Sequence, residues 1–158
     1  MGEQRVDQQP GGVRALRAGD RDAWDALWAA YLRFYRHDLD AAVTEATFAR
    51  LCRGGDDLFG LVAVDAADRP VGFAHVLLHA STWSPTSVCY LEDLFVDPAA
   101  CGGATGRALI DATLAQARER GATAVYWRTQ AFNGRARSLY DQVARLSSDV
   151  MYEVELDG

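Results

Sequence analysis

The feature that most constrains the fold is a strand-like run that leads through a glycine-containing loop into a helix-like run. Residues 88–96 are rich in apolar and strand-forming side chains, and Pro98 ends that run. Residues 103–120 then have the composition of a helix that Gly121 ends, and residues 123–129 form another strand-like run. A strand, a helix and a strand in this order predict two parallel strands joined by a right-handed crossover.

The segments on either side of this unit predict the rest of the sheet and its helices. Residues 58–64 and 71–78 are apolar runs joined by a turn-rich loop, so they predict a hairpin. Aromatic residues at helical spacing predict a helix over 24–35, and a second helix is expected to begin near Thr44 and end at Gly54. The remaining expected elements are strands at 13–17 and 150–156 and a helix at 134–144.

The resulting fold class is α/β, with the element order β-α-α-β-β-β-α-β-α-β. An antiparallel block followed by a β-α-β unit predicts a mixed sheet with helices on both faces. A chain of 158 residues fits one domain. We expect residues 1–12, which are mostly polar, to be a disordered lead-in and residues 13–158 to form that single domain.

Composition and charge argue against several classes of protein. The formal net charge of −6 disfavours a general nucleic-acid binder. The apolar runs fall short of the roughly 18 residues that cross a membrane, and the polar start lacks the features of a secretory signal, so we expect a cytoplasmic protein without a membrane partner. The three cysteines are odd in number and widely spaced, which predicts neither disulfides nor a metal site.

The loop after residues 88–96 has the chemistry of a phosphate-binding turn. Gly102, Gly103 and Gly106 allow close approach of the backbone to a ligand, and the start of the following helix offers unpaired N–H groups and a positive dipole end. Arg107 can add a charge-assisted contact. The alternative is a plain connection between a strand and a helix.

Residues 91–109 resemble the acetyl-CoA site of the GCN5-related N-acetyltransferase family. The family motif, Gln/Arg-x-x-Gly-x-Gly/Ala, maps without gaps onto Cys101-Gly102-Gly103-Ala104-Thr105-Gly106. The resemblance implies that this loop and Arg107 bind the pyrophosphate of acetyl-CoA. Cys101 replaces the usual arginine or glutamine and Ala104 replaces the first glycine, so we expect binding weaker than is typical of the family, with its loss as the alternative.

A second segment, Asn133-Gly134-Arg135-Ala136-Arg137-Ser138-Leu139-Tyr140, resembles the family pattern Asn-x-x-Ala-x-x-Leu-Tyr. The resemblance implies that Asn133, together with Arg137, contacts the cofactor arm. It also places Tyr140 near the sulfur as a general acid, a role that suits a phenol with an ordinary pKa of about 10. The alternative for Tyr140 is a core aromatic on a helix.

The strand Leu91-Glu92-Asp93-Leu94-Phe95-Val96 is similar to the Leu-Glu-Asp strand of diamine and thialysine acetyltransferases. This resemblance implies that Glu92 removes a proton from the attacking amine and that Asp93 helps to bind it, although either could be structural. It implies that the backbone N–H of Leu94 polarises the thioester carbonyl, with Phe95 and Val96 beside pantetheine. It also implies a bulge in this central strand.

The pattern Trp-x-x-Tyr-x-x-Phe-Tyr at 28–35 resembles a subgroup of fungal histone, polyamine and D-amino-acid acetyltransferases. Such a stripe also suits a helix packed on the core. We expect the acceptor pocket to include Tyr35, His37, Asp38 and Trp83, whereas His75 and His79 suit structural roles.

The sequence therefore predicts an enzyme that transfers acetyl from acetyl-CoA to a primary amine of a polyamine or an amino-acid-like molecule. Direct attack within a ternary complex is the expected route, and a homodimer is implied by the family. Two alternatives remain: a non-catalytic acyl-CoA-binding homologue with a degenerate loop, and an acetyltransferase of protein lysines or N-termini.

Overall fold

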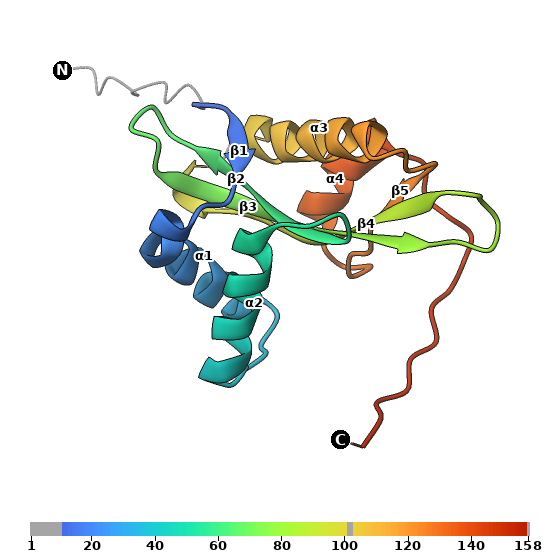
Figure 1. Cartoon of the computed structure of the whole chain (residues 1–158), viewed down its shortest axis with the longest axis horizontal. Helices are drawn as coiled ribbons and strands as arrows, with labels where there is room; N and C mark the ends of the chain where they lie inside the picture. Colours follow the sequence, from blue (N-terminus) through green and yellow to red (C-terminus); the bar gives the residue numbers. More distant parts are fainter. Residues whose placement is uncertain (1–10, 101–102, 158) are drawn as a thin grey trace. The chain divides into compact units, whose positions relative to one another are not determined.

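A computed structural model of the chain describes residues 11–100 and 103–157. The chain, drawn in Figure 1, divides into two compact units, Met1–Arg128 and Thr129–Gly158. That residues 13–158 form a single domain stays a prediction. Among the described residues, no helix is both long enough and apolar enough to span a membrane.

The first unit is built on a five-stranded mixed sheet with strands in sequence order. Antiparallel pairing joins four of the strands: β1 (Val13–Ala15), β2 (Leu58–Val64), β3 (Pro70–Ala80) and β4 (Ser87–Val96). The last strand, β5 (Val125–Tyr126), pairs with β4 in parallel. The predicted hairpin and the predicted parallel crossover are thus confirmed.

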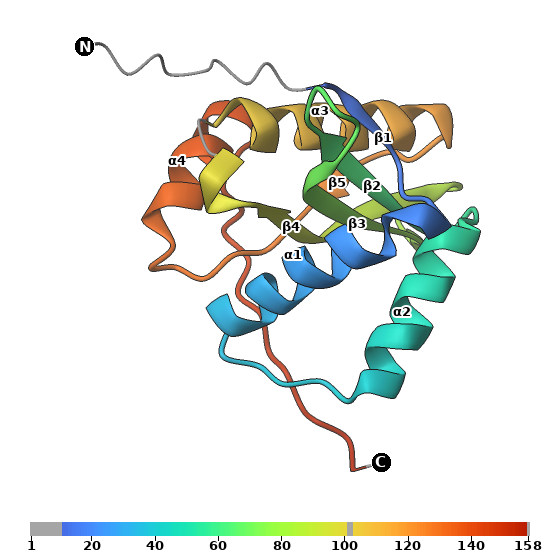
Figure 2. The ribbon, with the colours of Figure 1, turned by 90° about the vertical axis from the view of Figure 1, so that its left-hand side faces the viewer.

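Helices cover both faces of this sheet (Figures 1 and 2). One face carries α1 (Arg21–Phe34), which follows the short helix η1 (Ala18–Asp20), and α2 (Ala41–Arg53). The other face carries α3 (Ala104–Glu119), which follows the short helix η2 (Pro98–Ala100). The mixed sheet, the order of its strands and the helices on both of its faces therefore confirm the predicted α/β class as far as β5.

The core on the α1 side is aromatic. Trp24 and Phe73 are fully buried there, and they pack with the buried side chains of Trp28, Phe48 and Leu51. The Trp24 ring lies 5.5 Å from that of Trp28 and 5.0 Å from that of Phe48. The aromatic stripe of α1 is thus mainly a packing surface, as its helical spacing allows.

The second unit contains α4 (Gly134–Val143), which ends one residue before the end of the helix predicted at 134–144. The strand predicted at 150–156 is wrong, because the structure assigns no strand there. The predicted strand at 123–129 is reduced to the two residues of β5. Alternation of apolar residues specifies a strand only where a neighbouring strand supplies backbone partners and a core buries one face. Here Val150 and Tyr152 remain 77% and 92% exposed.

The start of the described chain is held to β2. Gly11 donates its N–H to the carbonyl of Val64, and Val64 donates its own N–H to the carbonyl of Gly12. The ordered pairing therefore begins ahead of the predicted start at residue 13. The predicted lead-in otherwise falls on residues 1–10, which lie outside the described residues.

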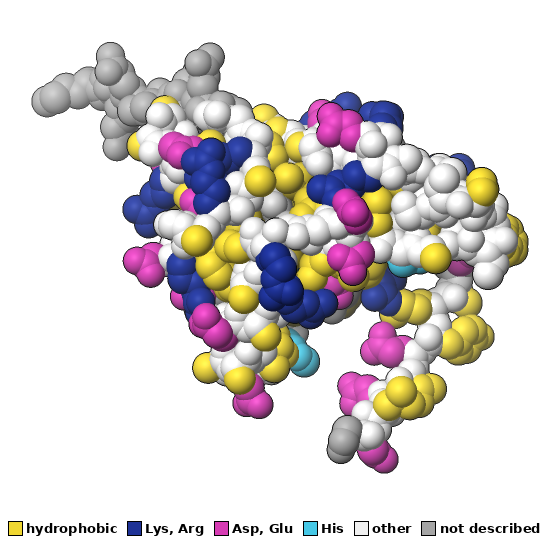
Figure 3. Space-filling view, viewed as in Figure 1, with side chains coloured by type: hydrophobic (Ala, Val, Ile, Leu, Met, Phe, Trp, Pro, Cys, Tyr) yellow, Lys and Arg dark blue, Asp and Glu magenta, His cyan; other side chains and the backbone are white. Residues whose placement is uncertain are grey.

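A bidentate ion pair fixes β1 to the start of α1. Two guanidinium nitrogens of Arg14 lie 2.8 and 2.9 Å from the carboxylate oxygens of Asp20, which also accepts the backbone N–H of Arg17. Hydrogen bonding from Arg14 lowers the pKa of Asp20. Acidic and basic side chains are interspersed over the face seen in Figure 3, but the Asp20 side chain is only 8% exposed.

Replacing Asp20 with asparagine should lower the free energy of unfolding by about 2 kcal/mol at neutral pH, since a charged hydrogen-bond acceptor is lost. A lowered folded-state pKa contributes stability above the unfolded value and loses it as the pH falls through the folded value. The difference between wild type and D20N should therefore shrink below about pH 4. Urea unfolding at several pH values measures it.

The matched control is D111N. Asp111 pairs with Arg107, but both side chains are about half exposed. This substitution should change stability by less than about 0.5 kcal/mol. Equal effects of D20N and D111N would contradict the role given to the buried pair.

Candidate active site

β4 contains a bulge at Glu92. His75 of β3 lies opposite Asp93, the next residue, Val76, lies opposite Leu91, and Glu92 has no partner of its own. A bulge sets two consecutive residues against one and bends the strand. The predicted bulge in the central strand is confirmed.

The bulge brings two carboxylates together. Partial burial and the charge of Asp93 raise the pKa of Glu92, which keeps access to solvent. Both carboxylates also raise the pKa of the Tyr31 phenol on α1, after the larger effect of burial. Glu92 and Asp93 therefore act on the same region beside α1, although strict alternation would send them to opposite faces.

Beyond the bulge, one edge of β4 lacks a neighbouring strand. β5 pairs with β4 only at Cys89 and Tyr90. The N–H of Asp97 donates to β3 at Val71, and alternation along the strand then turns the N–H groups of Leu94 and Val96 to the opposite edge. Within the described part of the chain, no strand pairs with that edge after Tyr90.

Leu94 thus lies where a backbone N–H can meet a carbonyl oxygen, and Val96 offers a second donor on the same edge. Phe95 does not share this edge. Alternation turns its N–H toward β3, and its ring lies 6.0 Å from that of Tyr31, on the α1 side.

The glycine-containing loop ends at the N-terminus of α3. Gly103 precedes the helix with a φ of 80°, a left-handed conformation that favours glycine. Thr105 and Gly106 are buried in the first turn, whereas Ala104 is exposed. Arg107 donates to Asp111 at 3.2 Å. Cys101 and Gly102 lie outside the described residues.

These features fit acetyl-CoA, a long molecule whose phosphate groups carry negative charge. The start of α3 presents backbone N–H groups that have no partner within the helix, and such groups favour phosphate. The open edge of β4 presents further donors to an amide-containing arm. Both features belong to the first unit and are joined by the short segment that contains η2.

A buried hydrogen-bond network reaches Asp93 from α1 and β3. Tyr31 donates its hydroxyl to Asp93 Oδ1 at 2.6 Å, and His75 Nδ1 lies 2.9 Å from Asp93 Oδ2. Trp24 donates its indole N–H to His75 Nε2 at 3.1 Å. Sequence reasoning found Asp93 but missed its partners, because Tyr31 and Trp24 belong to an ordinary core stripe.

The predicted acceptor residues are only partly brought together. The Tyr35 ring lies 4.8 Å from that of Tyr31, and burial followed by the charge of Asp93 raises the pKa of Tyr35. His37, Asp38 and Trp83 are exposed, and no side-chain contact with Asp93 is found for them in the described structure.

A group that sequence reasoning also missed lies around Tyr90, two residues before Glu92. The Tyr90 and Tyr126 rings stack at 4.8 Å, and Arg128 donates from Nε to the Tyr90 hydroxyl at 2.9 Å. The charge of Arg128 opposes the rise in the pKa of Glu92. His79 Nε2 lies 2.8 Å from the Tyr126 hydroxyl. The alternation of Tyr90 with Glu92 along the strand is the signal that could have found this group.

The second unit holds the other predicted residues. Asn133 caps α4 by accepting the N–H of Ala136 at 3.4 Å, and its amide donates to the Thr129 hydroxyl. Arg137 donates to the carbonyl of Ala131 at 2.8 Å. Tyr140 is partly buried. The roles predicted for Asn133, Arg137 and Tyr140 stay predictions.

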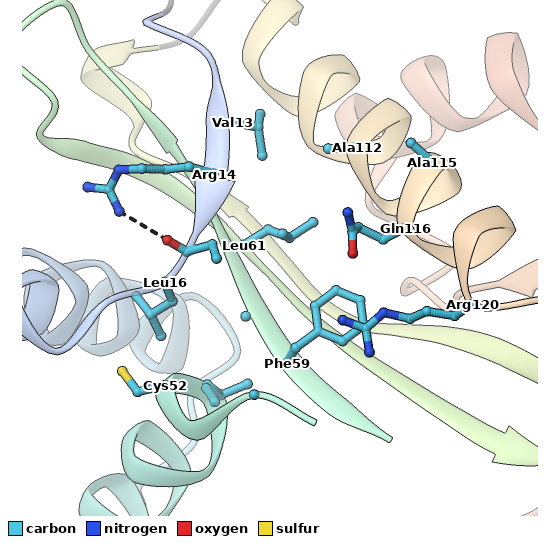
Figure 4. Close-up of a pocket in the computed structure, with 14 residues that line it drawn as sticks. Val13, Arg14, Leu16, Cys52, Phe59, Leu61, Ala112, Ala115, Gln116 and Arg120 are labelled. Atoms are coloured by element: carbon cyan, nitrogen blue, oxygen red, sulfur yellow. Dashed lines mark hydrogen bonds between the residues drawn. The ribbon is translucent and has the colours of Figure 1, made fainter. Parts of the chain in front are cut away.

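A separate cavity of about 310 Å³ lies among β1, β2, α2 and α3 (Figure 4). It is lined largely by apolar side chains, and the Arg120 guanidinium stacks 4.0 Å above the Phe59 ring at its wall. None of the predicted site residues lines it. The carboxylate pair and the open edge of β4 therefore remain the candidate site.

Comparison with known proteins places this site in a family. The acetyltransferase (GNAT) family profile matches residues 22–144. The chain is 37% identical over 142 residues to D-amino-acid N-acetyltransferase HPA3 of Saccharomyces cerevisiae, covering 89% of this chain and 88% of the yeast protein.

Solved structures agree on the fold. A probable acetyltransferase has a TM-score of 0.80 at 19% identity, covering 92% of this chain and 98% of that one. The aminoglycoside enzyme AAC(6')-Iy, in complex with a bisubstrate analogue, has a TM-score of 0.78 at 16% identity, covering 92% and 97%. Because the family match spans most of the chain and the yeast relative aligns over most of both proteins, this chain belongs to the GNAT family of acetyltransferases.

Proposed function

We propose that the protein transfers the acetyl group of acetyl-CoA to a primary amine of a small molecule, amino-acid-like or polyamine, by direct attack. The observation that carries the proposal is the bulge, which sets Glu92 beside an unpaired strand edge that includes Leu94. A base and a hydrogen-bond donor for a developing oxyanion thus lie within three residues of each other along one strand.

When bound, acetyl-CoA supplies an electrophilic thioester carbonyl. Glu92 takes a proton from the ammonium of the acceptor, either directly or through water, and its raised pKa makes it a stronger base than an ordinary carboxylate. Leu94 donates its N–H to the carbonyl oxygen as negative charge develops there. Tyr140 donates a proton to the sulfur as the C–S bond breaks, and its phenolate takes up the second proton that the nitrogen loses as the neutral amide forms.

The loop and the start of α3 hold the pyrophosphate in this proposal. Gly103 to Gly106 provide backbone donors. The guanidinium of Arg107 can add a further donor if it gives up its hydrogen bond to Asp111 and binds the pyrophosphate instead. Cys101 supplies no strong side-chain donor, so affinity for the cofactor is reduced.

The charges near Glu92 support an amino-acid-like acceptor. Two adjacent carboxylates favour an ammonium group. The positive charges of Arg128 and Arg50 both act to lower the pKa of Glu92, so positive charge also lies near this carboxylate. An acceptor with an amine next to a carboxylate complements such a mixture of charges. The name of the yeast relative, a D-amino-acid N-acetyltransferase, points the same way.

The direct test is a turnover assay with acetyl-CoA and matched acceptors, read by product mass. D-phenylalanine, phenethylamine, which lacks only the carboxylate, and spermidine form an informative set. We expect acetylation of the amino acid with a kcat/KM above that of phenethylamine. Acetyl-CoA binding without acetylation of any amine would instead support a non-catalytic acyl-CoA-binding protein.

Replacing Glu92 with glutamine should lower kcat about 100-fold, because the general base is lost. In the wild type, activity should fall as the pH drops through the raised pKa of Glu92, since only the deprotonated carboxylate accepts the proton. That acidic limb should disappear in E92Q. Steady-state kinetics across pH measures both effects.

The control for this substitution is E45Q, which removes an exposed carboxylate of α2 that pairs with Arg21. E45Q should keep the wild-type pH profile. An E92Q enzyme with kcat within about threefold of the wild type would exclude Glu92 as the base.

Cofactor binding gives a separate prediction. Cys101→Arg should bind acetyl-CoA about tenfold more tightly than the wild type, because it restores a charge-assisted donor near the phosphates. Isothermal titration calorimetry measures the two affinities. Equal affinities would show that Cys101 does not limit binding.

A further inference from the structure

The strongest unassigned feature is the buried series of side-chain hydrogen bonds that runs from Trp24 through His75 to Asp93. Trp24 is fully buried and His75 is 3% exposed, while the Asp93 side chain is 15% exposed. The His75 ring is held flat against Phe73, with 4.4 Å between centroids and 12° between planes. These hydrogen bonds therefore link the solvent-excluded core to a carboxylate that is still partly exposed to solvent.

The chemistry of Trp24 fixes the protonation pattern of His75. An indole nitrogen can only donate, so His75 Nε2 accepts from Trp24 and its proton must lie on Nδ1. Nδ1 then donates to Asp93 Oδ2. If the proton moved to Nε2, the N–H groups of Trp24 and His75 would face each other, and Asp93 would lose one of its two donors.

Asp93 is thus fixed through both of its oxygens. Oδ2 accepts a hydrogen bond from His75, and Oδ1 accepts one from Tyr31. Each carboxylate oxygen accepts about two hydrogen bonds, so each can accept one more. The charge of Asp93 acts on both Tyr35 and Glu92, so its negative charge reaches the space in which the acceptor amine is proposed to bind.

We propose that His75 is a positioning residue: with its tautomer fixed by Trp24, it orients Asp93 to bind the ammonium group of the acceptor while Glu92 removes the proton. The proposal rests on the function proposed above. The two adjacent carboxylates have separate tasks because their surroundings differ. Asp93 is clamped by two donors, whereas Glu92 is the extra residue of a bulge and is exposed.

Such a role has a kinetic signature. A group that binds the ammonium equally in the ground state and the transition state changes KM and leaves kcat nearly unchanged. Loss of the His75 bond should therefore raise KM for the amine and leave KM for acetyl-CoA unchanged. A purely structural role would lower the folded fraction, which reduces the apparent kcat and leaves both KM values alone.

Two substitutions separate the two bonds of His75. In H75N the side-chain amide can take the place of Nδ1 and still donate to Asp93, whereas the partner for Trp24 is lost. In H75Q the longer amide can take the place of Nε2 and accept from Trp24, whereas the donor to Asp93 is lost. Each variant thus keeps one of the two buried hydrogen bonds.

The experiment measures thermal stability and steady-state kinetics of wild type, H75N and H75Q with acetyl-CoA and the best acceptor of the wild type. We expect H75Q to raise KM for the amine about tenfold and H75N to raise it no more than about threefold, with similar losses of stability. Equal KM values in the two variants would overturn the proposal. Absence of turnover in the wild type would instead overturn the proposed function.

Nitrogen NMR of the wild-type protein tests the tautomer without turnover or substitution. The chain has three histidines, so long-range ¹H–¹⁵N spectra can be assigned to each ring. We expect His75 to carry its proton on Nδ1, with Nε2 free to accept from Trp24. A proton on Nε2 would overturn the proposal even if both variants fail to fold.

Discussion

One extra residue in β4 is the constraint on which the site depends. An antiparallel ladder has a period of two, so an inserted residue shifts the phase of every side chain and backbone group that follows it. Before Glu92, the edge of β4 pairs with β5, and after it the same edge has no strand beside it. The single insertion therefore sets two carboxylates side by side and determines that the N–H groups of Leu94 and Val96 face this unpaired edge.

The rest of the first unit holds this irregularity in place. A bulge weakens local pairing, and here side chains of the core compensate for it. Asp93 is tied to α1 through Tyr31 and to β3 through His75, and His75 is tied to α1 through Trp24. The aromatic core is thus also the support of the polar site, since the same rings that exclude water fix the orientation of a carboxylate.

The sequence predicted the order of elements up to β5 because apolar periodicity and glycine or proline boundaries are local signals. It predicted the bulge and Glu92 only through a family resemblance, since nothing local in Leu91-Glu92-Asp93 demands an inserted residue. The partnership of His75 with Asp93 could not be read, because it joins side chains 18 residues apart across a register shift. The strand expected at 150–156 failed for the same reason, since a strand depends on a distant partner.

Amide exchange at β4, followed by NMR with and without acetyl-CoA, tests the central claim that the open edge after the bulge receives the cofactor. The account predicts that the N–H groups of Leu94 and Val96 exchange quickly in the free protein and slow markedly at saturating acetyl-CoA. The N–H of Phe95, which faces β3, should be slow in both states. Unchanged exchange at Leu94 and Val96, with acetyl-CoA demonstrably bound, would contradict the account.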